Sequence, residues 1–104
     1  MCFIEETKFH LSKIIMKTYL ISYDLNQPLQ NYGELIEAIK EYSNWWHHLD
    51  SVWIIKTEET TVQVRDYLRP YIDSNDELLV VGLNGEGAWF GFNDRGSEWL
   101  KNNL

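Results

Sequence analysis

Three segments of this chain have the composition of β-strands and carry apolar side chains on both of their faces. Successive side chains of a strand point to opposite faces, so a sheet built from such segments is apolar on its front and on its back. Because a small soluble monomer rarely exposes a large contiguous apolar area, both faces of this sheet require a cover. The three segments are residues 18–23, 45–56 and 77–83.

Two further segments have helical spacing of their apolar residues and lie between the predicted strands. The first follows Asn31, which forms a capping-box-like pair with Glu34. The second follows Thr60, whose capping partner is Gln63, and Pro70 marks its end or a kink near it. The chain therefore alternates strands with two helices.

A short fourth strand is expected at 88–92 and a short C-terminal helix at 97–104. Together the elements predict an α+β fold, namely a ferredoxin-like βαββαβ sandwich with an antiparallel sheet and an added C-terminal helix. Right-handed crossovers place both main helices on the same face of that sheet. The other apolar face then has no helix from this pair to cover it.

The uncovered face predicts a homodimer, which either buries that face or continues the sheet between subunits. The alternative is that the chain covers the face itself. In that case the N-terminal extension and the C-terminal helix fold back over the sheet.

The chain is expected to form one domain, residues 16–104, preceded by a separable extension, residues 1–15. Met16 directly precedes the first strand and is a possible translation start. The acidic pair at 5–6 interrupts the apolar residues of the extension and argues against a secretory signal. A single cysteine, Cys2, excludes an internal disulfide and fits a reducing cytoplasm. No apolar run approaches the roughly 18 residues that a membrane span needs.

The net charge is −7, from 16 acidic and 9 basic residues. Such a charge argues against a duplex DNA binder, because DNA affinity depends on cations that replace counterions at the phosphates. It leaves open a small anionic ligand, a metal-bridged phosphate or a basic protein partner.

The most distinctive stretch is the tryptophan- and histidine-rich run at 45–53. Treated as one strand, it sends alternate side chains to opposite faces. One interpretation is an interface strand whose aromatic rings pack a dimer; the other is a ligand-binding surface on which rings stack on a nucleobase while His or Ser binds phosphate or ribose. One face carries Trp45, His47, Leu49, Ser51 and Trp53, and the other carries Trp46, His48, Asp50 and Val52.

A glycine-rich stretch at 84–92 contains Trp89. Glycines let backbone N–H groups approach an anion, but the stretch does not lead into a helix at the spacing of a dinucleotide fingerprint. A glycine-rich hairpin at a sheet edge is the alternative interpretation.

Three short motifs resemble those of a known group. Residues 19–24, ending in Tyr23 and Asp24, resemble the first strand of the small CRISPR-associated endonucleases that partner the spacer integrase, and the virulence-associated protein D toxins are similar. Residues 49–54 and 75–81 resemble the second and third strands of the same family.

The resemblance implies a ferredoxin-like homodimer from the bacterial or phage cytoplasm. It also implies that acidic residues ending the two first strands face each other across the dimer axis and hold a divalent metal such as Mg²⁺. In this sequence that catalytic and metal-binding role falls on Asp24. Asn26 lies beside it and offers an amide oxygen of the kind that hard cations bind.

These observations predict a homodimeric protein that handles a small nucleotide-type ligand. One alternative is a Mg²⁺-dependent endoribonuclease, in which RNA is the ligand, and another is a purely structural protein-interaction dimer. We expect neither duplex DNA nor a membrane as a partner. The predicted ligand-binding residues are Tyr23, Asn26, Trp45, Trp46, His47, His48, Asp50, Ser51, Trp53 and Trp89.

Overall fold

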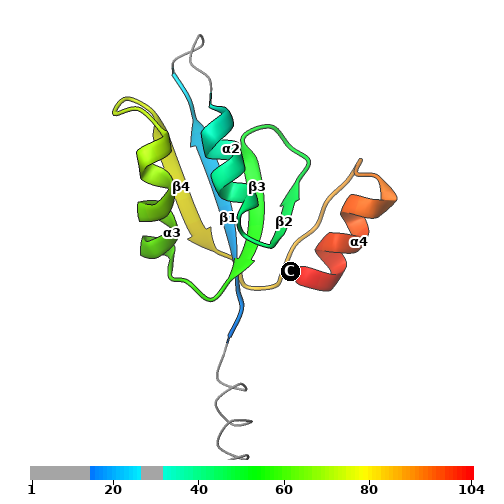
Figure 1. Cartoon of the computed structure of the whole chain (residues 1–104). Coiled ribbons are helices and arrows are strands. Elements are labelled where there is room, and N and C mark those ends of the chain that lie inside the picture. Colours follow the sequence, from blue (N-terminus) through cyan, green and yellow to red (C-terminus); the bar gives the residue numbers. More distant parts are fainter. Residues whose placement is uncertain (1–14, 27–31) are drawn as a thin grey trace, which may run out of the picture.

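The computed structural model describes residues 15–26 and 32–104 of the chain. The predicted extension, apart from Ile15, and the predicted cap Asn31 lie outside these residues. Figure 1 shows the arrangement of the elements. They are β1 (Lys17–Asp24), α2 (Gly33–Lys40), β2 (Asn44–His47), β3 (Val52–Thr57), α3 (Thr61–Leu68), the 3-10 turn η1 (Arg69–Tyr71), β4 (Glu77–Gly82) and α4 (Asp94–Asn103).

The strands form one antiparallel sheet in the order β2-β3-β1-β4. In the two central strands, Ile21 of β1 lies opposite Trp53 of β3, and it also lies opposite Val80 of β4. The predicted α+β class with an antiparallel sheet is confirmed, and the arrangement is compatible with a ferredoxin-like fold. None of the helices in the described residues combines the length and the apolar composition of a membrane span.

The main core lies between one face of the sheet and the two helices α2 and α3. Alternate side chains of β1 and β3 point into it, as strand geometry requires. The fully buried side chains include Ile21, Trp53, Ile55, Leu35, Ile39, Val64 and Leu68.

The predicted capping box of α3 is confirmed. The backbone N–H of Gln63 donates to the Thr60 hydroxyl at 3.1 Å, and the backbone N–H of Thr60 donates to the Gln63 side chain at 2.8 Å. The helix ends at Leu68, directly before the 3-10 turn that contains Pro70. A proline has no N–H for a helical hydrogen bond, which explains this end.

The prediction of one long strand at 45–56 is wrong, because the segment is a hairpin of β2 and β3. Ser51 has a φ of 59°, in the left-handed region, and the backbone N–H of Val52 donates to the carbonyl of Leu49 at 3.3 Å. Asp and Ser favour such turns because their short polar side chains can bond to nearby backbone groups. The Asp50–Ser51 pair is therefore a turn and not the middle of a strand.

The strand predicted at 88–92 is also wrong, since these residues have no regular secondary structure. Gly85 and Gly91 have φ values of 91° and 89°, which few other residues adopt and which interrupt an extended ladder. The sheet still has four strands, because the hairpin supplies the additional one.

The C-terminal segment covers part of the second face of the sheet. Trp46 and Ile54 from β2 and β3 are buried there against Leu100 of α4. The helix begins at Asp94, three residues before the predicted start, because the Asn93 side chain caps it by accepting from the backbone N–H of Gly96 at 2.8 Å. The alternative prediction, in which the chain itself covers this face, is thus confirmed for the C-terminal helix over the β2–β3 half, while the N-terminal extension of that prediction lies outside the described residues apart from Ile15.

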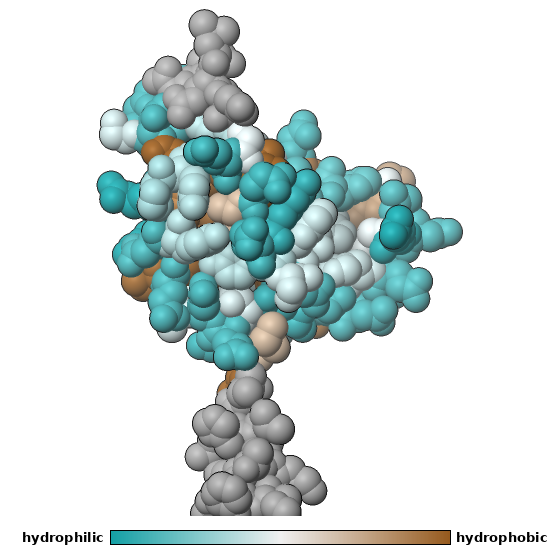
Figure 2. Space-filling view, viewed as in Figure 1, coloured by the Kyte–Doolittle hydropathy of each residue, from teal (hydrophilic) through white to brown (hydrophobic). Residues whose placement is uncertain are grey.

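The β1–β4 half of the second face is more open. Leu79 is 54% exposed and Val81 is 37% exposed, and both belong to β4, which is an edge strand. Leu20, opposite Val81 on β1, is partly buried. By contrast, the surface in Figure 2 is largely hydrophilic over the helices.

Candidate functional site

An aromatic surface, defined here as Trp45, His47 and Trp53, lies on the β2–β3 hairpin. The His47 ring stacks on the Trp53 indole with centroids 3.8 Å apart and planes inclined by 26°. The Trp45 ring lies 5.3 Å from the same indole. Trp53 is fully buried, whereas Trp45 is 37% exposed and His47 is also exposed. The buried indole therefore supports two rings that solvent can reach.

The supporting indole is held in place by a hydrogen bond. The Trp53 Nε1–H donates to the Tyr23 hydroxyl of β1 at 3.0 Å. A buried tryptophan usually finds such a partner for its N–H. Tyr23 and Trp53 are therefore the fixed base of the aromatic surface, and only Trp45 and His47 face outward from it.

A cation lies next to the exposed indole. The Lys40 Nζ, in the last turn of α2, lies 5.6 Å from the centroid of a Trp45 ring, within the range of a cation–π contact. Desolvation lowers the pKa of His47, against the opposing effect of nearby Asp50. The surface thus combines stacking area, a positive charge and an imidazole whose neutral form is favoured.

The other predicted aromatic residues lie on the opposite side of the sheet. The Trp46 Nε1–H donates to the Gly96 carbonyl at 3.3 Å, and the Trp89 Nε1–H donates to the Ser97 hydroxyl at 3.1 Å. Both indoles pack in the second core under the C-terminal segment. His48 follows the end of β2, with its ring 4.6 Å from that of Phe92. The structure therefore divides the predicted set between two faces.

Asp24, the predicted metal ligand, ends β1 directly opposite Glu77 of β4. Both residues line a small hollow of about 200 Å³ together with Ser22 and Leu79. Like charges directly opposite each other destabilise a strand pair, so this placement is unfavourable without a counterion. Residues 15–26 and 32–104 contain no group of three or more His, Cys, Asp or Glu arranged to hold a metal.

Asn26 is hydrogen-bonded to the turn that precedes β4. Its backbone N–H donates to Asp76 Oδ1 at 2.8 Å, and its side-chain Nδ2 donates to the Asn75 carbonyl at 2.6 Å. The Tyr32 hydroxyl and the backbone N–H of Asp73 also donate to the Asp76 carboxylate. Desolvation raises the pKa of Asp76, but these hydrogen bonds outweigh it and the net shift is downward.

Sequence reasoning missed the role of Asp76. The stretch at 73–76 is a turn, in which the Asp76 N–H donates to the Asp73 carbonyl at 3.1 Å. The partners Asn26 and Tyr32 lie more than forty residues away in the chain, so no local signal indicates them.

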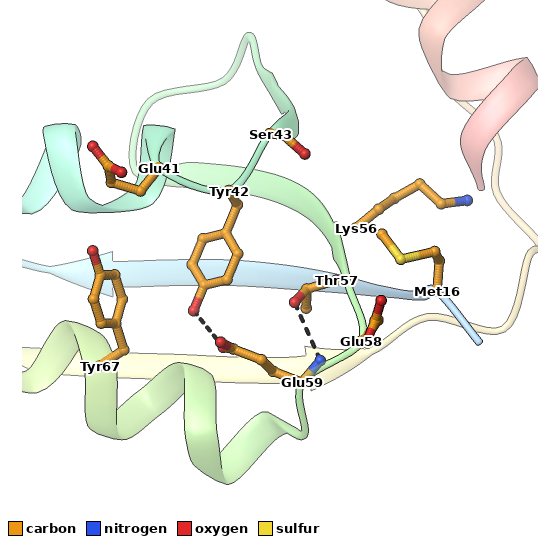
Figure 3. A pocket seen from close by; sticks show the side chains of 9 residues that line it. All are labelled: Met16, Glu41, Tyr42, Ser43, Lys56, Thr57, Glu58, Glu59 and Tyr67. Atoms are coloured by element: carbon orange, nitrogen blue, oxygen red, sulfur yellow. Dashed lines mark hydrogen bonds between the residues drawn. The ribbon is translucent and has the colours of Figure 1, made fainter. Parts of the chain in front are cut away.

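A second hollow, of about 410 Å³, lies where α2, β3 and α3 come together, and it was also not predicted. Figure 3 shows Tyr42 pointing at Glu59, whose Oε1 accepts from the Tyr42 hydroxyl at 2.8 Å. Burial and the Glu59 carboxylate raise the pKa of Tyr42. The Tyr19 hydroxyl donates to the Glu59 backbone carbonyl at 2.5 Å. The Glu58–Glu59 pair directly before the cap Thr60 is the sequence signal that indicates acidic groups here.

No known family model matches the chain, and no solved structure matches it at a significant level. The resemblance of the three short motifs to the CRISPR-associated and virulence-associated families therefore stays an expectation.

Proposed function

We propose that the protein binds a small nucleotide-type ligand on its aromatic surface and does so as a homodimer. The observation that carries the proposal is the pair of accessible rings, Trp45 and His47, supported by the buried Trp53 and flanked by the Lys40 ammonium. Stacking of a base on an aromatic side chain contributes about 1–3 kcal/mol and requires no net positive charge. It therefore suits a chain whose net charge is −7.

Each residue has a chemical role in this proposal. A nucleobase stacks on the accessible indole of Trp45, and the Lys40 ammonium meets the phosphate. The neutral His47 imidazole has one donor and one acceptor nitrogen, which suits a ribose hydroxyl. The Ser51 hydroxyl and the Asp50 carboxylate, in the turn of the same hairpin, add polar groups near its rim.

The proposed fold is the ferredoxin-like βαββαβ sandwich. Its support is the order strand, helix, two strands, helix, strand up to β4, together with the sheet order β2-β3-β1-β4. Both α2 and α3 contribute side chains to the same core cluster, which places them over one face.

The homodimer is proposed to form on the β1–β4 half of the second face, which the C-terminal segment leaves open. Its support is the exposure of Leu79 and Val81 on an edge strand, since unpaired strand edges and exposed apolar side chains favour association. If neither a ligand nor a nuclease activity exists, this dimer would be a structural interaction module.

The ligand proposal is tested by isothermal calorimetry with mononucleotides, dinucleotides and cyclic oligonucleotides. We expect saturable heat with at least one member and its loss in Trp45→Ala. The absence of heat with every member would contradict the proposal.

A Mg²⁺-dependent ribonuclease is the second candidate, and a specific observation favours it. Asp24 is paired across the strands with Glu77, so one subunit offers two carboxylates to a divalent cation. In this candidate Asp24 is the catalytic and metal-binding residue. Mg²⁺-dependent RNA cleavage that is lost in Asp24→Ala would support it, and unchanged cleavage in that variant would contradict it.

A further inference from the structure

A groove lined by tyrosines runs along the outer junction of α2 and α3, away from the aromatic surface. It consists of two adjoining hollows, of about 410 and 310 Å³, which share Glu41 and Tyr67. Volumes of a few hundred Å³ are typical of ligand sites. We define the tyrosine groove by its main lining residues, which are Glu37, Glu41, Tyr42, Glu59, Tyr67 and Tyr71.

The tyrosines form a continuous aromatic wall. The rings of Tyr42 and Tyr67 meet edge to face with centroids 5.9 Å apart, and those of Tyr67 and Tyr71 lie 6.2 Å apart. Tyr67, in the middle, is 40% exposed. Figure 3 shows Tyr42 and Tyr67 next to each other in the larger hollow. Aromatic faces of this kind attract cations through the ring quadrupole.

The carboxylates around the wall form no ion pairs in the described part of the chain. Glu34 and Glu37 lie along one side of α2, Glu41 follows at its C-cap, and all three are exposed. Within residues 15–26 and 32–104, the only ion pair joins Arg65 to Asp66. The groove is therefore a negatively charged aromatic surface whose carboxylates are not ion-paired among these residues, although Lys56 also lines the larger hollow.

The nearby lysines are directed elsewhere. The Lys56 Nζ donates to the Asn103 carbonyl at 3.1 Å, and Figure 3 shows its side chain extending away from Glu59. Lys40 is on the same helix as Ala38, which lines the smaller hollow, but its Nζ lies over the Trp45 ring. Desolvation raises the pKa of Tyr67 most, and the neighbouring Tyr71, Glu41 and Glu59 raise it further.

The geometry points to a further binding function: the tyrosine groove docks an extended, lysine- or arginine-bearing segment of a partner protein. Charge complementarity selects a cationic occupant, and the aromatic wall suits alkylammonium and guanidinium groups. Glu37 and Glu41 are one helical turn apart, about 6 Å along the axis. This spacing is close to the roughly 6.8 Å between side chains on one side of an extended chain. A peptide with alternate basic residues therefore meets the carboxylates in register.

The test uses calorimetry of the full chain with an octapeptide of alternating Lys and Gly, a matched Glu and Gly octapeptide, and spermine. We expect the basic peptide to bind and the acidic peptide not to bind. In the double variant Glu37→Gln/Glu41→Gln, the affinity for the basic peptide should fall by about tenfold or more. The matched control is Glu86→Gln/Glu98→Gln, which removes the same charge from exposed positions outside the groove. It should change the affinity less than about twofold.

Tyr67→Ala tests the aromatic wall without changing the charge, because Tyr67 is 40% exposed and does not belong to the core cluster. We expect it to weaken peptide binding severalfold, with unchanged far-UV circular dichroism. Equal losses in the two glutamate double variants would overturn the proposal by showing a diffuse charge effect. No binding of the basic peptide, or binding of spermine alone, would also overturn it.

Discussion

The ring centroids of His47 and the buried Trp53 lie 3.8 Å apart, and the two residues are direct cross-strand partners in the β2–β3 hairpin. The hairpin thus holds an accessible histidine and an accessible tryptophan on one rigid, buried ring. Pre-arranged side chains lose less conformational freedom on binding, which favours affinity. The same hairpin directs Trp46 to the other face, where it anchors the C-terminal segment.

Replacement of Trp45 by Ala should weaken binding of the nucleotide ligand by about 5- to 150-fold, which corresponds to the loss of one stacking contact. Stability should change little, because the side chain is partly exposed on an edge strand. Calorimetric titration and thermal unfolding measure the two quantities. Phe90→Ala is the control, since Phe90 is 96% exposed and lies outside the aromatic surface. Equal losses in both variants would contradict the assigned site.

Replacement of Trp53 by Ala should lower the free energy of unfolding by about 3–5 kcal/mol, because a fully buried indole leaves a large cavity. That loss is a large fraction of the stability of a small domain. Tyr23→Phe removes only the hydroxyl that accepts from Trp53 and leaves the N–H of this buried indole without a partner, so we expect a loss of about 1–3 kcal/mol. Urea denaturation followed by circular dichroism measures both, and a mild effect of Trp53→Ala would show that the hairpin does not depend on this ring.

Replacement of Leu79 by Glu should yield a monomer if β4 forms the subunit interface. A charged side chain at an apolar interface is left desolvated, and two symmetric copies repel each other. Sedimentation equilibrium over micromolar concentrations measures the mass of the wild type and the variant. Phe90→Glu adds the same charge at another exposed apolar position and should leave the dimer intact. A wild-type chain that sediments as a monomer throughout would remove the dimer from the proposal.

The sequence predicted the elements that depend on local signals, but it did not predict the features that depend on contacts between residues far apart in the chain. The cap Thr60 and the apolar run of β4 act through neighbouring residues, and both predictions agree with the structure. The 45–56 segment was misjudged because its apolar and aromatic residues continue on both sides of the turn at Ser51. Partners such as Trp46 and Gly96, or Asn26 and Asp76, are fifty residues apart, so only the folded chain shows them.

The same limit applies to the candidate sites. Strand alternation predicted that Trp46 lies on the opposite face from Trp45 and His47, and the structure confirms it. The position of Trp89 in the second core was not predicted, because it depends on the C-terminal segment folding over that face of the sheet. The tyrosine groove joins Tyr42, from the loop after α2, to Tyr67 of α3, and it arises only when these elements pack.

Replacement of Asp76 by Asn should lower the melting temperature at neutral pH, and it should make the melting temperature less sensitive to a fall in pH. In the folded protein the pKa of Asp76 is lowered, because hydrogen bonds from Asn26, Asp73 and Tyr32 outweigh the desolvation. A carboxyl whose pKa is lowered in the folded protein stabilises the fold at pH values above its unfolded pKa of 3.8. That stabilisation is lost as the pH falls through the pKa of the folded state. The wild type should therefore lose melting temperature between about pH 5 and 2 more steeply than the variant. Melting curves followed by circular dichroism across this range measure the slopes, and Asp66→Asn, at an exposed carboxylate on α3, serves as the control. Parallel slopes in the wild type and Asp76→Asn would show that the 73–76 turn is not held through this carboxylate.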